Sequence, residues 1–118
     1  MLSVRLVLIF GIVFLISTFA AGYAESPRRI EITAQRFSYS PASITLKKNE
    51  PVILVLRTAD VTHGLKISEF QITTSEIKKG KDTEIRITPE QSGHFVGKCA
   101  HFCGKGHGSM VLQIEVVP

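Results

Sequence analysis

Residues 50–58 read Glu-Pro-Val-Ile-Leu-Val-Leu-Arg-Thr, and their centre, residues 52–56, is an uninterrupted apolar run. A short apolar run of this kind is typical of a central strand that is buried on both faces. Pro51 fits the start of such a strand, where a missing N–H donor costs little. The run therefore predicts a β-strand in the interior of a sheet.

The segments on either side of this run alternate between apolar and polar residues, which is the pattern of strands with one buried face. Turn-forming Ser, Pro, Asn, Gly and Asp residues separate them, and no segment after residue 24 shows a sustained helical period. Short strands at this spacing predict an all-β sandwich or barrel. The expected flanking strands lie at residues 30–35, 43–46, 84–88 and 111–117.

Composition limits the class of protein. The chain has 118 residues, of which 44% are hydrophobic and 20% charged. This length suits one domain, and a chain this apolar can bury enough surface to fold. Lys and Arg exceed Asp and Glu by 14 to 10, a net charge of +4. These charges are spread along the chain, whereas nucleic-acid binding needs a dense basic face with aromatic residues. We therefore expect no nucleic-acid partner.

The chain begins with an uncharged stretch over residues 6–24 that follows a basic residue. Gly22 and Ala24 form a small-x-small end typical of a signal peptidase site, and the stretch is also long enough for a membrane anchor. Residues 1–24 are therefore predicted to be a signal peptide or an N-terminal hydrophobic anchor helix. Either one places residues 25–118 in the periplasm or on the outer face of the cytoplasmic membrane. Two arginines that soon follow disfavour this orientation, so the inverted topology stays open.

Both cysteines of the chain lie in a glycine-rich segment before the final strand, residues 97–110. Four candidate ligands occur there in the pattern C-x3-C-x3-H-x2-M, namely Cys99, Cys103, His107 and Met110. Thiolate, imidazole and thioether groups together favour copper over magnesium or calcium. A further candidate ligand, His63, lies upstream.

Two other interpretations explain less of this pattern. A disulfide between Cys99 and Cys103 would close a very short ring with little entropic gain, and it would leave His107 and Met110 without a role. Structural zinc binds Cys and His but has little use for Met. A blue single-copper site needs one Cys, two His and a Met, whereas the two thiolates of this chain can bridge two copper ions that share one electron.

The segments 60–63 and 97–110 resemble the CuA domain of cytochrome c oxidase subunit II, a module that also occurs in nitrous oxide reductase. The resemblance covers most of residues 30–118 and implies a cupredoxin-like Greek-key β-sandwich. It also implies a binuclear copper centre in which Cys99 and Cys103 bridge both ions. The remaining implied ligands are His63 and Met110 on one ion, and His107 and the backbone carbonyl of His101 on the other.

The chain departs from the family pattern in ways that affect its partners. The family commonly has an acidic or amide residue at the position of His101. Subunit II also has a Trp-containing aromatic cluster where electrons enter, whereas this chain has no Trp and offers Phe37 and Tyr39 instead. The net positive charge favours an acidic or neutral redox partner. We expect His94 to be an ordinary strand histidine and Asp60 to cap a turn rather than to orient a ligand.

The resemblance implies an electron-transfer module. It would accept electrons from a periplasmic donor, a cytochrome or a small copper protein, and pass them to a terminal oxidase or reductase. The sequence shows no catalytic constellation, so no reaction is expected on this chain alone. The alternative is a periplasmic copper carrier or assembly factor with a cupredoxin fold.

Overall fold

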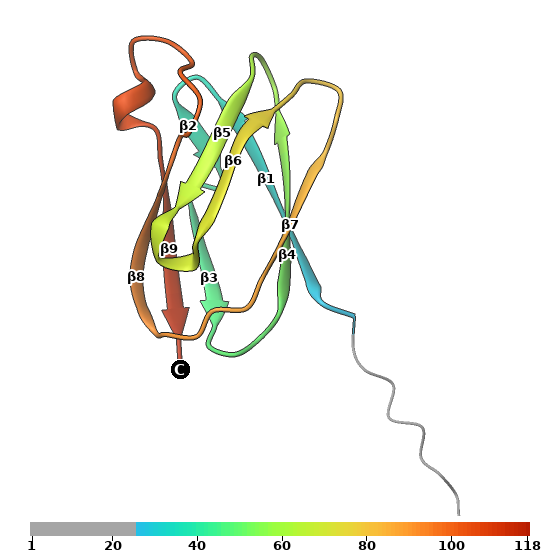
Figure 1. Ribbon diagram of the computed structural model, residues 1–118, viewed down its shortest axis with the longest axis vertical. Helices are drawn as coiled ribbons and strands as arrows, with labels where there is room; N and C mark the ends of the chain where they lie inside the picture. The colour runs from blue at the N-terminus through green and yellow to red at the C-terminus, as the bar shows by residue number, and fades with distance from the viewer. Residues whose placement is uncertain (1–25) are drawn as a thin grey trace, which may run out of the picture.

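The computed structural model describes residues 26–118, and the leader predicted over residues 1–24 lies outside this part. Residues 26–118 contain no helix that is long and apolar enough to cross a membrane. They form two β-sheets packed face to face, with two single-turn 3-10 helices (Figure 1). The predicted all-β sandwich is therefore confirmed.

The four-stranded sheet contains the apolar run that predicted a central strand. Its strands lie in the order β2-β1-β4-β7, with β1 parallel to β4 and the other pairs antiparallel. Leu54 and Leu56 point to one face of the sheet and Val55 points to the other. Val55 is only 2% exposed, so the run is buried on both faces as predicted. The strands are β1 (Arg28–Gln35), β2 (Ser38–Ser40), β4 (Val52–Thr58) and β7 (Thr83–Ile87).

The five-stranded sheet has the order β3-β9-β8-β5-β6, with β3 parallel to β9. Strands β5 and β8 are paired at a single register position, where Lys66 lies opposite Lys98. A 3-10 turn, η1 (Ser68–Phe70), joins β5 to β6. The strands are β3 (Ser43–Lys47), β5 (His63–Ile67), β6 (Ile72–Ile77), β8 (Gly93–Lys98) and β9 (Val111–Val117).

The alternating segments predicted from the sequence form β1, β3, β7 and β9, and their apolar residues face the interior. Strands β2, β5 and β6 were not anticipated. Strand β2 has only three residues, and β6 reads Ile-Thr-Thr-Ser-Glu-Ile, with apolar residues only at its ends. Pairing with neighbouring strands, rather than a local hydrophobic pattern, places these segments in sheets.

The connections β1–β2, β4–β5, β6–β7 and β8–β9 all lie at one end of the sandwich (Figure 1). The β8–β9 loop, residues 99–110, includes a second 3-10 turn, η2 (His107–Ser109). Because β8 and β9 are paired neighbours, both ends of this loop are held by the five-stranded sheet. The Cys99 N–H also donates to the Met110 carbonyl at 3.3 Å, which closes the base of the loop.

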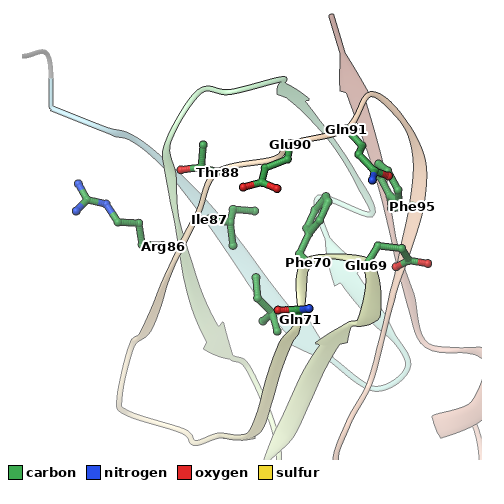
Figure 2. A pocket seen from close by; sticks show the side chains of 10 residues that line it. Glu69, Phe70, Gln71, Arg86, Ile87, Thr88, Glu90, Gln91 and Phe95 are labelled. Atoms are coloured by element: carbon green, nitrogen blue, oxygen red, sulfur yellow. The ribbon is translucent and has the colours of Figure 1, made fainter.

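A cleft of about 330 Å³ lies beside η1 and the β7–β8 connection. Figure 2 shows the Phe70 ring and the Glu90 carboxylate within it, and Arg86 pointing away. The rings of Phe70 and Phe95 stand 5.1 Å apart between centroids. None of the candidate ligands lines this cleft, so it is separate from the site predicted by the sequence.

Candidate metal centre

The two cysteines lie side by side at the start of the β8–β9 loop. Cys99 directly follows β8, and the chain doubles back so that its Sγ lies 3.8 Å from the Sγ of Cys103. Both thiols are free, and the two residues are only 7% and 5% exposed. Burial, followed by the hydrogen bond with Cys99, raises the pKa of the Cys103 thiol to about 11. The structure therefore has two buried thiols in contact and no disulfide between them.

The other two loop candidates gather around the same sulfur. The Sγ of Cys103 lies 3.8 Å from the Nδ1 of His107 and 3.8 Å from the Sδ of Met110. The turn η2 carries His107 back toward the cysteines, and Met110, at 1% exposure, is buried directly before β9. The other candidate donor atoms of the loop thus gather around the Sγ of Cys103.

His101 takes part through its backbone. Its carbonyl oxygen accepts a hydrogen bond from the Cys99 thiol at 3.1 Å, so this oxygen points toward the cysteine pair. The imidazole of His101 is half-buried and lines a shallow surface hollow with Phe102 and Thr62. The carbonyl of His101 thus faces the cysteine pair, and its role as a ligand stays a prediction.

His63 comes from the five-stranded sheet and not from the loop. It is the first residue of β5 and is fully buried. Its Nδ1 is buried without a hydrogen-bond partner, whereas its Nε2 lies 2.7 Å from the Oδ1 of Asp60. Candidate donor atoms of His63, Cys99 and Cys103 all lie within 4.8 Å of one another. Because buried polar atoms are normally paired, the unpartnered Nδ1 fits the place of a metal donor, and the nitrogen and sulfur set fits copper.

Asp60 holds His63 and caps the turn at the same time. Its carboxylate accepts hydrogen bonds from the N–H of Val61 at 2.6 Å and the N–H of Arg36 at 2.8 Å. Desolvation by burial opposes ionisation, but the hydrogen bonds from Arg36, His63 and Val61 outweigh it and hold the pKa of Asp60 well below its ordinary value. The sequence analysis favoured the turn role alone, and the structure adds the orienting role.

The β1–β2 turn braces the ligand loop from the four-stranded sheet. The Nε of Arg36 donates to the carbonyl of Cys103 at 3.1 Å. The ring of Phe37 lies against the loop so closely that a Cβ at Gly106 would stand 2.3 Å from its Cγ. A side chain at position 106 would therefore force the Phe37 ring or the loop to shift. Phe37, which the sequence related to electron entry, thus has a packing role that was not predicted, and the loop glycines were the available signal for it.

Tyr39 supports the site from inside the sandwich. It is 2% exposed, and its hydroxyl donates to the carbonyl of Gly64 at 2.6 Å, next to His63. Burial, followed by the nearby Cys99 and Cys103 thiols, raises the pKa of the Tyr39 hydroxyl above its ordinary value. Tyr39 therefore acts as a neutral hydrogen-bond donor that anchors the start of β5.

Two further residues lie outside the cluster of candidate ligands. Phe102 is 75% exposed, and its ring centroid is 5.7 Å from that of His107. His94 lies exposed on β8 and takes no part in the cluster, in agreement with the ordinary strand role expected of it.

Comparison with known proteins gives the family. The cupredoxin-like domain family matches residues 6–112. A Streptomyces avermitilis protein named "Probable cytochrome c oxidase subunit 2" is 32% identical over 75 residues, which cover 64% of this chain and 23% of that protein. The chain thus spans about a quarter of the length of the curated relatives it matches.

Solved structures share the fold. The periplasmic domain of subunit II of cytochrome oxidase from Bradyrhizobium japonicum has a TM-score of 0.71 at 18% identity, covering 80% of this chain and 86% of that chain. The metal-binding domain of the Cu(I)-exporting ATPase of Streptococcus pneumoniae has a TM-score of 0.62 at 25% identity, covering 76% and 85%. The chain therefore belongs to the cupredoxin-like domain family.

Proposed function

We propose that this chain is an electron-transfer protein with a binuclear copper centre. Cys99 and Cys103 would bridge the two copper ions. His63 and Met110 would complete one ion, and His107 and the backbone carbonyl of His101 the other. Such a centre supplies a site that gains and loses one electron shared by two metal ions.

One observation carries this proposal, namely the convergence of soft donor atoms on a buried pair of thiols. The Sγ of Cys103 has a second thiol, an imidazole nitrogen and a thioether within 3.8 Å. The unpartnered Nδ1 of His63 faces the same cluster. Two thiolates can share two metal ions, whereas a blue single-copper site uses only one thiolate.

The surrounding contacts suit electron transfer because they hold the donors in place. Asp60 orients His63, Arg36 binds the Cys103 carbonyl, and Phe37 packs on the loop. Partners that orient metal ligands are part of how a protein tunes its metal. With the ligands held from several sides, a change of redox state requires little movement of the chain.

The proposed setting follows the predicted leader and the relatives. Residues 1–24 would export or anchor the chain, with membrane anchoring through residues 6–24, and residues 25–118 would form the cupredoxin domain outside the cytoplasmic membrane. The donor would be a cytochrome or a small copper protein, and the acceptor a terminal oxidase or reductase. The chain would act as an electron-entry module of such a complex and not as an enzyme alone.

A second candidate is a copper carrier or assembly factor. It is favoured by the shared fold with the metal-binding domain of a Cu(I)-exporting ATPase, at 25% identity. A carrier must release its metal to a recipient, whereas the buried ligands and their bracing contacts favour retention.

Copper stoichiometry and an electron-spin resonance spectrum of the purified, copper-loaded chain test the proposal. Two copper ions per chain, with one unpaired electron spread over both nuclei, are expected. One copper ion, or an electron localised on a single nucleus, would contradict the binuclear centre. Rapid loss of copper to a weak Cu(I) chelator would favour the carrier.

A further inference from the structure

Two lysines face each other on the outer surface of the five-stranded sheet. Lys66 on β5 lies directly opposite Lys98 on β8, and both are exposed. Like charges directly opposite each other across a strand pair destabilise the sheet. Neither lysine forms an ion pair within residues 26–118. The fold thus carries an unfavourable pair of charges that its own acidic residues do not neutralise.

The outer face of the four-stranded sheet handles its cations differently. Arg29 pairs with Glu84, and Arg57 pairs with Asp82 at 2.9 Å and with Glu31 at 3.4 Å. These charges are satisfied within the chain, whereas Arg86 on β7 forms no ion pair within residues 26–118. The Lys66–Lys98 pair differs from Arg86 because two like charges lie directly opposite each other across a strand pair.

The two lysines border a surface hollow of about 500 Å³. Val96, between His94 and Lys98 on β8, lines it and is 38% exposed, which is high for a valine in a sheet. Glu69 is the only carboxylate that lines the hollow, at the end formed by η1. Val96 thus gives the hollow an apolar patch, and neither lysine forms an ion pair with Glu69, an arrangement suited to acidic side chains of another protein.

The hollow also lies next to the proposed copper ligands. Lys98 is the last residue of β8, and Cys99 follows it directly. A protein bound over Lys98 would therefore be one peptide unit away from a proposed bridging ligand. This gives the surface a functional role that a remote charged patch would lack.

We infer that the Lys66–Lys98 hollow is the docking surface for the acidic face of a redox protein that exchanges electrons with this chain. The inference rests on the proposed electron-transfer function and adds to it the surface and the charge of the partner. Acidic side chains of the partner pair with the two lysines, and Val96 packs against apolar residues of the partner. Attraction between complementary charges speeds association and weakens as salt increases.

The test uses the full chain and two reduced c-type cytochromes as probes, one acidic and one basic. Binding is measured by titration of the metal-free chain, and electron transfer by stopped-flow reduction of the copper-loaded chain. At an ionic strength of about 10 mM we expect the acidic cytochrome to bind and react at least tenfold more strongly than the basic one, and we expect this preference to vanish at about 500 mM.

The double variant Lys66→Glu/Lys98→Glu should abolish the preference in the titration of the metal-free chain, a readout that does not depend on the reduction potential. The matched control Lys47→Glu/Lys48→Glu reverses two exposed lysines at the far end of β3 and should behave like the unmodified chain. If the double variant does not fold, Lys66→Glu alone should reduce the preference about threefold, because it removes half of the charge.

Equal responses of the two double variants would overturn the docking surface, as would failure of the acidic cytochrome to bind. The titration needs no copper, so it separates the two proposals. Salt-dependent binding at Lys66 and Lys98 without a two-copper spectrum would refute the copper centre and retain the surface. A two-copper spectrum without preferential binding would do the reverse.

Discussion

The two sheets of the sandwich differ in their candidate ligands and in the pairing of their surface charges. The five-stranded sheet holds both ends of the ligand loop, supplies His63 and presents unpaired lysines. The four-stranded sheet supplies none of the candidate ligands, and Arg29 and Arg57 on its outer face are paired with carboxylates. The four-stranded sheet pairs Arg29 and Arg57 internally and leaves Arg86 without an ion pair within residues 26–118, whereas the five-stranded sheet leaves both donor atoms and a facing pair of lysines unpaired.

This difference indicates that the residues for function and many of the residues for stability lie in different sheets. Most candidate ligands lie on a loop between two adjacent strands of one sheet, where a change of sequence leaves the other sheet intact. The four-stranded sheet reaches the site through Arg36, which donates to the Cys103 carbonyl, and through Tyr39 of β2, which donates to the Gly64 carbonyl next to His63. Variants on the two sheets should therefore have separable effects.

The largest effect is expected for Cys103→Ser on the ligand side. Cys103 contacts every other loop candidate except the His101 carbonyl, so its loss removes the centre of the cluster. We expect no more than one copper ion per chain and no spectrum of a shared electron, as measured by metal analysis and electron-spin resonance.

Met110→Leu is the matched control for this substitution. Leucine keeps the volume of the buried side chain but removes a weak thioether ligand, so two copper ions and the shared electron should remain, with a shifted reduction potential. An unchanged spectrum in Cys103→Ser would refute the bridging role.

Sequence and structure agree where the information is local. The run 52–56 predicted a central strand because its residues are apolar on both faces, and β4 confirms it. Cys99, Cys103, His107 and Met110 lie within twelve residues, so their spacing alone brings them together. Their role as copper ligands stays a prediction.

What the sequence did not reveal depends on contacts between distant segments. Arg36 and Asp60 meet because β1 and β4 are parallel neighbours, and such a pairing has no signature in either segment alone. The brace formed by Phe37 depends on the loop folding back over the β1–β2 turn. Strand β5 alternates poorly, since only Lys66 among its five residues is exposed.

The second-largest effect is expected at Asp60, which links the two sheets. Its carboxylate accepts from the Arg36 N–H on one side and contacts His63 on the other. In Asp60→Ala the His63 ring loses its orienting partner, so copper affinity should fall about 10- to 100-fold. Competition with a Cu(I) chelator measures the change.

Asp60→Asn serves as its comparison because the amide oxygen can still accept one hydrogen bond. Its affinity should lie between those of Asp60→Ala and the unmodified chain. Equal affinities in all three proteins would show that Asp60 caps the turn without positioning His63.

A smaller effect is expected where the four-stranded sheet touches the ligand loop. In Gly106→Ala the new Cβ would stand 2.3 Å from the Cγ of Phe37, so the ring or the loop must move. We expect the metal-free protein to lose about 1–3 kcal/mol of unfolding free energy, as overpacked sites do. Urea denaturation measures this loss.

Gly108→Ala is the control for the loop substitution, since nothing lies within 4 Å of a Cβ at that position. It should change the free energy of unfolding by less than about 0.5 kcal/mol. Equal destabilisation of the two variants would indicate that loop flexibility, and not contact with Phe37, determines the effect.

The smallest effect is expected for Arg57→Ala on the four-stranded sheet. Its guanidinium pairs with Asp82 and Glu31 at the surface, and exposed ion pairs of this kind contribute little because water and salt screen them. Thermal unfolding should change little, and the copper spectrum and the rate with the acidic cytochrome should not change. A marked drop in that rate would mean that cations on both faces guide the partner, and the functional separation of the two sheets would then fail.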